Sequence, residues 1–197
     1  MASEAAAPEA SAVAARPLNS PWSIWEHREN TGGGWDANMF KLCDFESVGE
    51  FWGYWNSIPK PSEIFFDGNS NKRFVDRKVS SFSIFKKGIK PEWEDEANKR
   101  GGEWFCRKRM DPAALDELWL HLVLGMIGET IDAGDEITGV RVVDKSKRDI
   151  IYRIELWFRN GSKDAAPAYH ELRDRMQACL EAGSGRGVPQ FQFRPHF

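Results

Sequence analysis

Seven short segments of the chain have a strand-like pattern, in which β-branched and aromatic residues recur with polar residues between them. They are residues 20–28, 39–45, 80–86, 102–109, 136–144, 150–159 and 189–194. Residues 1–16 differ from these segments, because they are rich in alanine, carry scattered acids and have neither a basic start nor a long apolar run. We therefore expect residues 1–16 to be a disordered tail, not a signal peptide, and residues 17–197 to form one domain.

Three other segments have apolar residues at helical spacing. Residues 47–58 begin with a Ser-Val-Gly-Glu capping box, residues 111–128 have Asp at the N-cap and Gly past the end, and residues 164–182 carry one apolar face. The strands come mostly in pairs, without the regular alternation of strand and helix that is typical of a parallel sheet. We therefore expect an α+β fold, in which helices cover one side of an antiparallel sheet and leave the other face open.

The segment 150–159 indicates what the open face carries, because alternate residues of a strand point to opposite faces. One face is apolar and is expected to lie under the helices: it consists of Ile150, Tyr152, Ile154, Leu156 and Phe158. The other face carries Arg153, Glu155 and Trp157, a combination typical of a binding surface. A tryptophan covered by arginine stems at an ordinary solvent face gives the same pattern.

The composition restricts the kind of ligand and compartment. With 27 basic and 30 acidic residues, a net charge of −3 and a mean hydropathy of −0.55, the chain lacks the positive field that holds duplex nucleic acid along a long track. The three cysteines, Cys43, Cys106 and Cys179, and the four histidines do not have the spacing of a metal site. The longest apolar stretch, 118–127, is too short to cross a bilayer. We expect a protein of the reducing cytoplasm, without metal, cofactor or membrane contact.

Tryptophan is unusually frequent, with nine in 197 residues, which suggests that some indoles face a ligand. Trp35 follows three glycines, and Trp93 lies in a loop with a proline and four acids. Together with Trp157, loop indoles at the open face can stack on a flat base. The Glu94 carboxylate matches the two N–H donors on the Watson–Crick edge of guanine. Taken singly, each loop tryptophan also fits a plug at the edge of the core, and Glu94 a solvated charge.

Four strings connect the chain to a known family. They are GGWDAN at 33–38, V-x-x-FW at 48–52, IKPEWEDEANKRGG at 89–102 and the helical segment 119–129. Through these strings the chain resembles eukaryotic translation initiation factor 4E from about Pro17 to its C-terminus. The resemblance implies a single curved, mainly antiparallel sheet of about eight strands backed by three helices on its convex face. It also implies that the concave face binds the 7-methylguanosine cap of mRNA.

The resemblance assigns a role to each residue of the cap site. Trp35 and Trp93 are expected to stack on the two faces of the methylated guanine, Glu94 to bind its edge, and Trp157 to lie against the N7-methyl group. Because methylation at N7 puts a delocalised positive charge on the purine, two indole faces favour the methylated base by a cation–π energy on the order of 2 kcal/mol. No bond is made or broken, so the resemblance implies a binding protein and not an enzyme.

The phosphates of the cap require cations near the same pocket. Arg153 stands where the family has a phosphate-binding lysine, and the preceding turn carries Lys145, Lys147 and Arg148. Of these, Lys145 is the first choice for the family's phosphate-binding arginine. A basic turn taken alone more often belongs to a solvated hairpin tip. Glu103 stands where the family usually has an arginine near the phosphates, so we expect this acid to weaken triphosphate binding.

A second site is implied on the back of the sheet, where the family binds a Tyr-x-x-x-x-Leu helix from initiation factor 4G or from competing repressors. The residues implied in this partner site are Pro17, Leu18, Val48, Trp52, Leu120, His121 and Leu124. Leu120 and Leu124, four residues apart, are apolar outside the main core stripe of their helix. Trp52 also fits the core stripe of its own helix. His121 replaces an acid of the family, which leaves the charge preference of the partner open.

The sequence therefore predicts a monomer that binds capped mRNA and joins it to a 4G-type scaffold for translation initiation. The alternative is a cap-binding homologue that represses translation or stores mRNA through a different scaffold. His121 and the long segment between residues 58 and 82 keep this alternative open.

Overall fold

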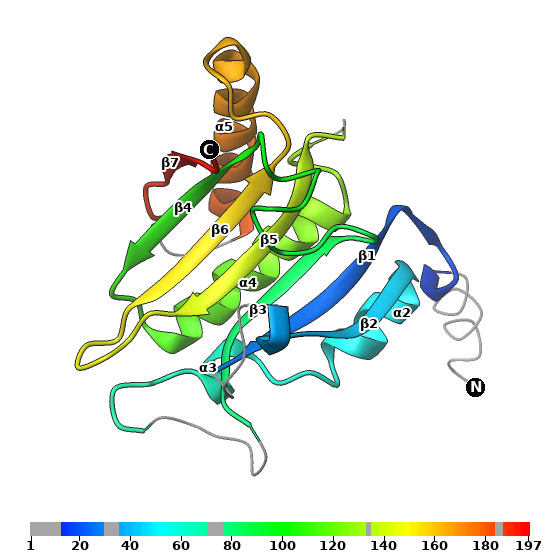
Figure 1. Cartoon of the computed structure of the whole chain (residues 1–197). Helices are drawn as coiled ribbons and strands as arrows, with labels where there is room; N and C mark the ends of the chain where they lie inside the picture. Colours follow the sequence, from blue (N-terminus) through cyan, green and yellow to red (C-terminus); the bar gives the residue numbers. More distant parts are fainter. Residues whose placement is uncertain (1–12, 30–35, 71–76, 133–134, 184–186) are drawn as a thin grey trace.

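Seven strands form one antiparallel sheet in the computed structural model, which describes residues 13–29, 36–70, 77–132, 135–183 and 187–197. The strand order is β2-β1-β3-β5-β6-β4-β7, and the sheet is curved (Figure 1). The strands are β1 Pro17–Arg28, β2 Met39–Ser47, β3 Val79–Lys86, β4 Gly102–Lys108, β5 Ile137–Asp144, β6 Tyr152–Phe158 and β7 Gln192–Pro195. All seven strands expected from the sequence are confirmed.

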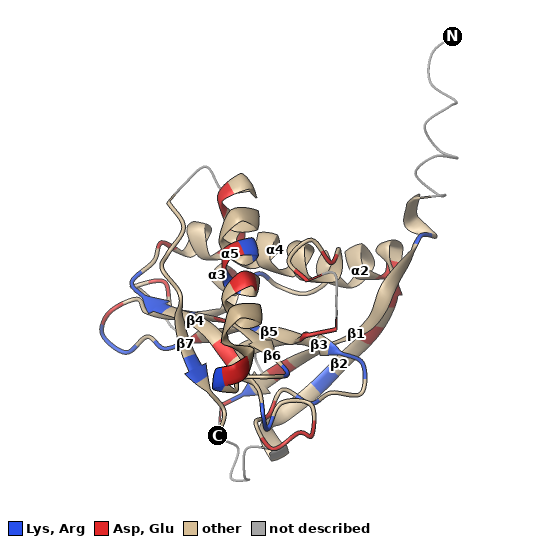
Figure 2. Ribbon diagram, turned by 90° about the horizontal axis from the view of Figure 1, so that it is seen from above, with Lys and Arg blue, Asp and Glu red and all other residues tan. Residues whose placement is uncertain are grey.

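The helices lie on one side of this sheet, as Figure 2 shows from above. They are α2 Val48–Trp55, α3 Pro61–Ile64, α4 Pro112–Ile127 and α5 Ala166–Gly183, with 3-10 turns at η1 Asp36–Asn38 and η2 Lys163–Ala165. The three predicted helices are confirmed as α2, α4 and α5. The single turn α3 was not predicted, because four residues are too few to show a helical period.

The helix ends follow local side-chain chemistry. The Ser47 hydroxyl accepts the backbone N–H of Glu50 at 3.3 Å, and the Glu50 carboxylate accepts that of Ser47 at 3.1 Å, which completes the capping box. Asp111 caps α4 by accepting two backbone N–H groups. Helix α2 ends at Trp55, three residues earlier than predicted. Pro59 disfavours the helical conformation for the residue before it, so the chain leaves α2 through a turn.

The main core lies between the sheet and the helices. From β6 it receives Tyr152, Ile154, Leu156 and Phe158, which confirms the apolar face predicted for this strand. A smaller buried cluster, formed by Phe85, Ile89 and Trp157, lies on the other face of the sheet. Because side chains alternate along β6, burial of Leu156 under the helices turns Trp157 toward the concave face.

Candidate functional site

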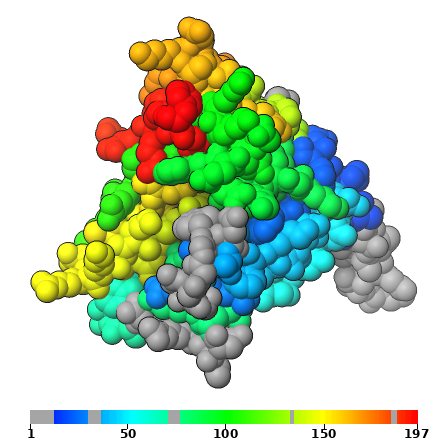
Figure 3. Space-filling view, viewed as in Figure 1, coloured from blue at the N-terminus to red at the C-terminus, as the bar shows by residue number. Residues whose placement is uncertain are grey.

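A pocket of about 440 Å³ opens on the concave face of the sheet. It is lined by Pro91, Glu92, Trp93 and Glu94 from the loop after β3, by Arg141 from β5 and by Trp157 from β6. Three of the residues predicted for the cap site, Trp93, Glu94 and Trp157, therefore meet in one pocket. The fourth, Trp35, lies outside the described residues. Figure 3 shows the loop in green beside the red C-terminal segment on this face.

Two polar side chains hold the loop 87–101 in shape. The buried Asn98 donates its amide N–H groups to two carbonyl oxygens of the loop, each at 2.9 Å, and Asp95 accepts two backbone N–H groups, also at 2.9 Å. These four hydrogen bonds fix the turn that carries Trp93 and Glu94, so the loop is preorganised for a ligand. Sequence reasoning missed both residues, although Asn and Asp commonly bond to nearby backbone in turns.

The C-terminal segment supports Trp93, whose side chain is 41% exposed. The ring of Trp93 stacks on His196, with centroids 5.8 Å apart and 19° between the planes. The Arg194 guanidinium lies 4.4 Å from the centroid of the same ring. His196 also contacts Trp157, at a centroid distance of 4.5 Å, and its backbone N–H donates to Gly101 at 3.1 Å. Arg194 and His196, which sequence reasoning did not assign to the site, therefore support two side chains that line the pocket.

Trp157 forms a rigid wall of the pocket. It is 1% exposed and packs edge-on against Phe85 at a centroid distance of 5.3 Å. Its Nε1–H donates to the Glu155 carboxylate at 2.8 Å. Because the ring is packed and its N–H is hydrogen-bonded within the protein, the orientation of the indole does not depend on a ligand.

Five charged side chains, which we call the charge ladder, lie on the concave face in and beside the pocket: Glu103, Arg141, Arg153, Glu155 and Arg194. Arg153 pairs with Glu103 and, at 2.5 Å, with Glu155, while Arg194 pairs with Glu103 at 2.8 Å. Burial, helped by the nearby charge of Glu155, raises the pKa of Glu103 to about 7. Burial also acts to raise the pKa of Glu155, but Arg141 and Arg153 outweigh it and hold that pKa below its usual value.

A family model described as Eukaryotic initiation factor 4E matches residues 17–196. The chain belongs to the eukaryotic initiation factor 4E family. Initiation factor 4E-2 of Schizosaccharomyces pombe is 38% identical over 154 residues, which are 77% of this chain and 57% of that protein. Initiation factor 4E1 of Drosophila melanogaster is 32% identical over 164 residues, or 82% and 58% of the two chains. The chain thus spans somewhat more than half the length of these relatives.

Solved structures of the family have the same fold. Those of initiation factor 4E-3 of Ascaris suum with an m7G cap and with an m2,2,7G cap each have a TM-score of 0.73, 26% identity and 92% coverage of both chains. Initiation factor 4E-3 of Caenorhabditis elegans, in complex with the 4E-binding protein Mextli, has a TM-score of 0.73 at 23% identity and shows the likeness of fold alone. The predicted fold class is confirmed.

In this member of the family, the predicted phosphate-binding residues lie in two environments. Arg153 is buried and held by two carboxylates, and its guanidinium lies 3.8 Å from the centroid of the Phe105 ring. Lys145, Lys147 and Arg148 are exposed in the turn between β5 and β6. The turn cations are therefore accessible to a phosphate, whereas Arg153 has only a small exposed part.

The structure changes the interpretation of Glu103. Its side chain is fully buried, and its carboxylate pairs with Arg153 and Arg194. The negative charge is thus compensated inside the protein, so an effect of Glu103 on the cap phosphates has to act through these two arginines. The sequence showed the reversed charge but not its partners.

The residues of the predicted partner site lie on α2, on α4 and at the start of β1. Trp52 is 38% exposed and Pro17 is exposed, whereas the others are half-buried: Leu18, Val48, Leu120, His121 and Leu124. Trp52 is therefore a surface residue, and Phe51 beside it is the buried one. Ring contact with Phe51, at a centroid distance of 5.0 Å, orients the Trp52 indole.

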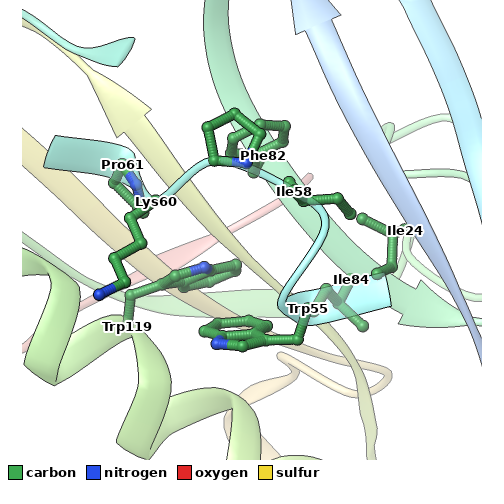
Figure 4. A pocket seen from close by; sticks show the side chains of 9 residues that line it. Ile24, Trp55, Ile58, Lys60, Pro61, Phe82, Ile84 and Trp119 are labelled. Atoms are coloured by element: carbon green, nitrogen blue, oxygen red, sulfur yellow. The ribbon is translucent and has the colours of Figure 1, made fainter. Parts of the chain in front are cut away.

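A second, apolar hollow of about 360 Å³ lies on the helix side of the sheet (Figure 4). Its walls include Trp55 and Trp119, whose rings stack 6.4 Å apart at 28°, and Ile58 and Phe82. Neither predicted site contains this hollow, because its walls come from distant segments whose meeting the sequence pattern does not reveal.

The described residues contain neither a helix that could span a membrane nor a cluster of side chains that could hold a metal ion. None of the helices there has the length and apolar character needed to span a membrane. Within the same residues, no three His, Cys, Asp or Glu side chains gather in the manner of a metal site.

Proposed function

We propose that this member of the initiation factor 4E family binds the 7-methylguanosine cap of mRNA in the concave pocket and joins it to a scaffold protein for translation initiation in the cytoplasm. The observation that carries the proposal is the meeting of Trp93, Glu94 and Trp157 in one pocket. The Ascaris suum protein, solved with cap ligands and 26% identical over 92% of this chain, supports it.

The proposed recognition follows from the chemistry of the lining residues. The half-exposed indole of Trp93 offers one stacking face, and Trp35 is proposed to offer the other. Stacking on a cationic purine contributes about 2 kcal/mol of cation–π energy when the site excludes water. The exposed carboxylate of Glu94 is proposed to accept the two N–H donors of the guanine edge, and Trp157 to pack against the N7-methyl group. Such a site binds its ligand without breaking a bond, so we propose that the protein is a binding protein and not an enzyme.

The scaffold is proposed to bind on the opposite side of the sheet through a Tyr-x-x-x-x-Leu helix. Trp52 supports this proposal, because an indole exposed on α2 is a typical interface anchor. A repressor that carries the same helix is the alternative partner. His121 favours this alternative, because it stands where the family has an acid that would pair with a basic residue of the scaffold.

The proposal is tested by titrating the intrinsic tryptophan fluorescence with methylated and unmethylated guanosine triphosphate. We expect saturable quenching with the methylated nucleotide and at least tenfold weaker binding of the unmethylated one, because only the methylated base is cationic. Equal affinity for the two nucleotides would contradict cap recognition. Isolation of the bound scaffold from cells would then separate an initiation partner from a repressor.

A further inference from the structure

A group of basic residues lies beyond the cap pocket, where β4 ends and where β5 turns into β6. We call it the basic end; it consists of Arg107, Lys108, Arg109, Lys145, Lys147 and Arg148, all of them exposed. Blue segments mark the end of β4 and the neighbouring turn in Figure 2. For a chain of net charge −3, this is a strong local concentration of positive charge.

The register of the sheet places part of the basic end on the same face as the pocket. Arg107 is directly opposite Arg153 on the neighbouring strand β6, so both point to the concave face. Lys145 follows on the next row, since its backbone N–H bonds to Ile151 at 2.9 Å. Arg153 is four residues from Trp157, which corresponds to about 13 Å along a strand. The basic end thus continues the pocket along β6.

Among the described residues, no carboxylate forms an ion pair with a cation of the basic end. Arg153 has two carboxylate partners, but in the described part of the chain Arg107 has none. Burial and the charges of Arg141, Arg153 and Arg107 together lower the pKa of Lys145, with only Glu155 opposing them. Like charges opposite each other in a sheet are unfavourable. An anion placed over these cations would therefore reduce their mutual repulsion.

The acids near the basic end do not offset its charge. Asp144 accepts the backbone N–H groups of Phe66 and Ser146, and Asp111 caps helix α4. Asp149 is exposed within the turn itself. Glu117 on α4 lines a hollow together with Lys108 and Arg109. Six cations against these four acids leave an excess of positive charge.

We propose that the basic end binds the phosphodiester backbone of the nucleotides that follow the cap. This inference rests on the proposed function, because a ligand held in the pocket brings its own polyanionic chain to the adjoining strand face. An acidic peptide would also suit the charges, but it has no attachment in the pocket. RNA is the ligand whose charged chain begins where the pocket ends.

The experiment compares three ligands: methylated guanosine triphosphate, a capped RNA of about ten nucleotides, and the same RNA without the cap. The test variant is Arg107→Gln/Arg109→Gln, which leaves the proposed cap residues intact. The matched control is Lys163→Gln/Arg175→Gln, which removes the same charge from exposed positions of η2 and α5, on the other side of the sheet. Affinities are measured between 50 and about 300 mM salt.

We expect the wild-type protein to bind the capped RNA more tightly than the cap nucleotide. In the test variant, affinity for the capped RNA should fall about tenfold and the slope of log affinity against log salt by about 1.4, since each single-strand phosphate contact contributes about 0.7. Affinity for the methylated nucleotide should change less than twofold, and the control variant should match the wild type.

Two outcomes would overturn the inference while leaving cap binding in place: equal affinity of the wild type for capped RNA and cap nucleotide, or equal losses for both ligands in the test variant. Weakened binding of a polyglutamate probe, with capped RNA unaffected, would instead identify an acidic peptide as the ligand. Failure of the wild type to bind the methylated nucleotide at all would contradict the proposed function itself.

Discussion

Glu103 on β4 and Arg194 on β7 are directly opposite each other, and Arg194 joins the buried carboxylate of Glu103 to the exposed ring of Trp93. The Arg194 Nε lies 2.8 Å from the Glu103 carboxylate, and the guanidinium carbon lies 4.4 Å from the ring centroid. One side chain therefore connects the charge ladder with the wall of the pocket. Glu103 therefore holds Arg194 where it contacts Trp93.

This connection predicts that Glu103→Gln and Arg194→Gln are not additive in their effect on cap affinity. Each change alone disturbs the support of Trp93, and the second change removes little more. We expect a coupling of about 0.5–1 kcal/mol, at the low end of the usual range because the Arg194 side chain is 40% exposed. A double-mutant cycle on the affinity for methylated guanosine triphosphate measures it. Additive losses would mean that the two residues act independently.

Trp93→Ala should weaken binding of the methylated nucleotide by about 1–3 kcal/mol, because one stacking face is lost. The fold should persist, since the side chain is 41% exposed. Isothermal titration calorimetry measures the affinity, and far-ultraviolet circular dichroism checks the fold. Tyr54→Ala, an exposed aromatic on α2, is the control and should bind normally. A folded Trp93→Ala protein with wild-type affinity would remove Trp93 from the site.

Asn98→Ala should loosen the loop that carries Trp93 and Glu94. The change leaves two loop carbonyl oxygens without their donors, which costs about 1–3 kcal/mol for each group that stays buried. We expect faster amide hydrogen exchange in residues 90–98 together with weaker cap binding. Asn160→Ala, in an exposed turn, should leave both measurements unchanged. Unaltered exchange in the Asn98 variant would show that the loop is held by other contacts.

His27 should make the protein less stable on acidification. Burial, assisted by the charges of Arg141 and Lys145, lowers the pKa of His27 to about 4. The unfolded chain binds a proton near pH 6.5, whereas the folded protein resists it, so stability is complete above about pH 6.5 and declines as the pH falls toward 4.

Urea unfolding between pH 4 and 7 measures this effect. His27→Gln should reduce the loss of unfolding free energy between pH 7 and pH 4 by about 1–2 kcal/mol. This value is discounted because the His27 ring is partly exposed. His170→Gln, at an exposed position of α5, should keep the wild-type slope. An identical slope in both variants would show that His27 does not contribute.

Trp52→Ala should abolish binding of a Tyr-x-x-x-x-Leu peptide and leave cap affinity within twofold of the wild type. The reason is that Trp52 is exposed on α2, which lies on the opposite side of the sheet from the pocket. Fluorescence anisotropy of a labelled peptide measures the first effect and nucleotide titration the second. Loss of both activities would indicate that Trp52 supports the fold and not an interface.

Local features were readable from the sequence because their causes lie within a few residues. The alternation along 150–159 determined that Leu156 enters the core and Trp157 the opposite face, since the period of a strand is two. The Ser47 and Glu50 pair and Asp111 determined where two helices begin, because a cap bonds to backbone three residues away at most. The sequence strings that resemble the family assigned Trp93 and Glu94 to the predicted cap site without a structure.

Tertiary structure alone decided which distant residues support the site. Arg194 and His196 reach Trp93 because β7 pairs with the edge strand β4, and no local pattern encodes a contact across about a hundred residues. Burial of Glu103 and its pairing with Arg153 and Arg194 follow from the register of three strands. Register is decided by packing of the whole sheet, since shifting a strand by one residue would turn each of its side chains to the other face.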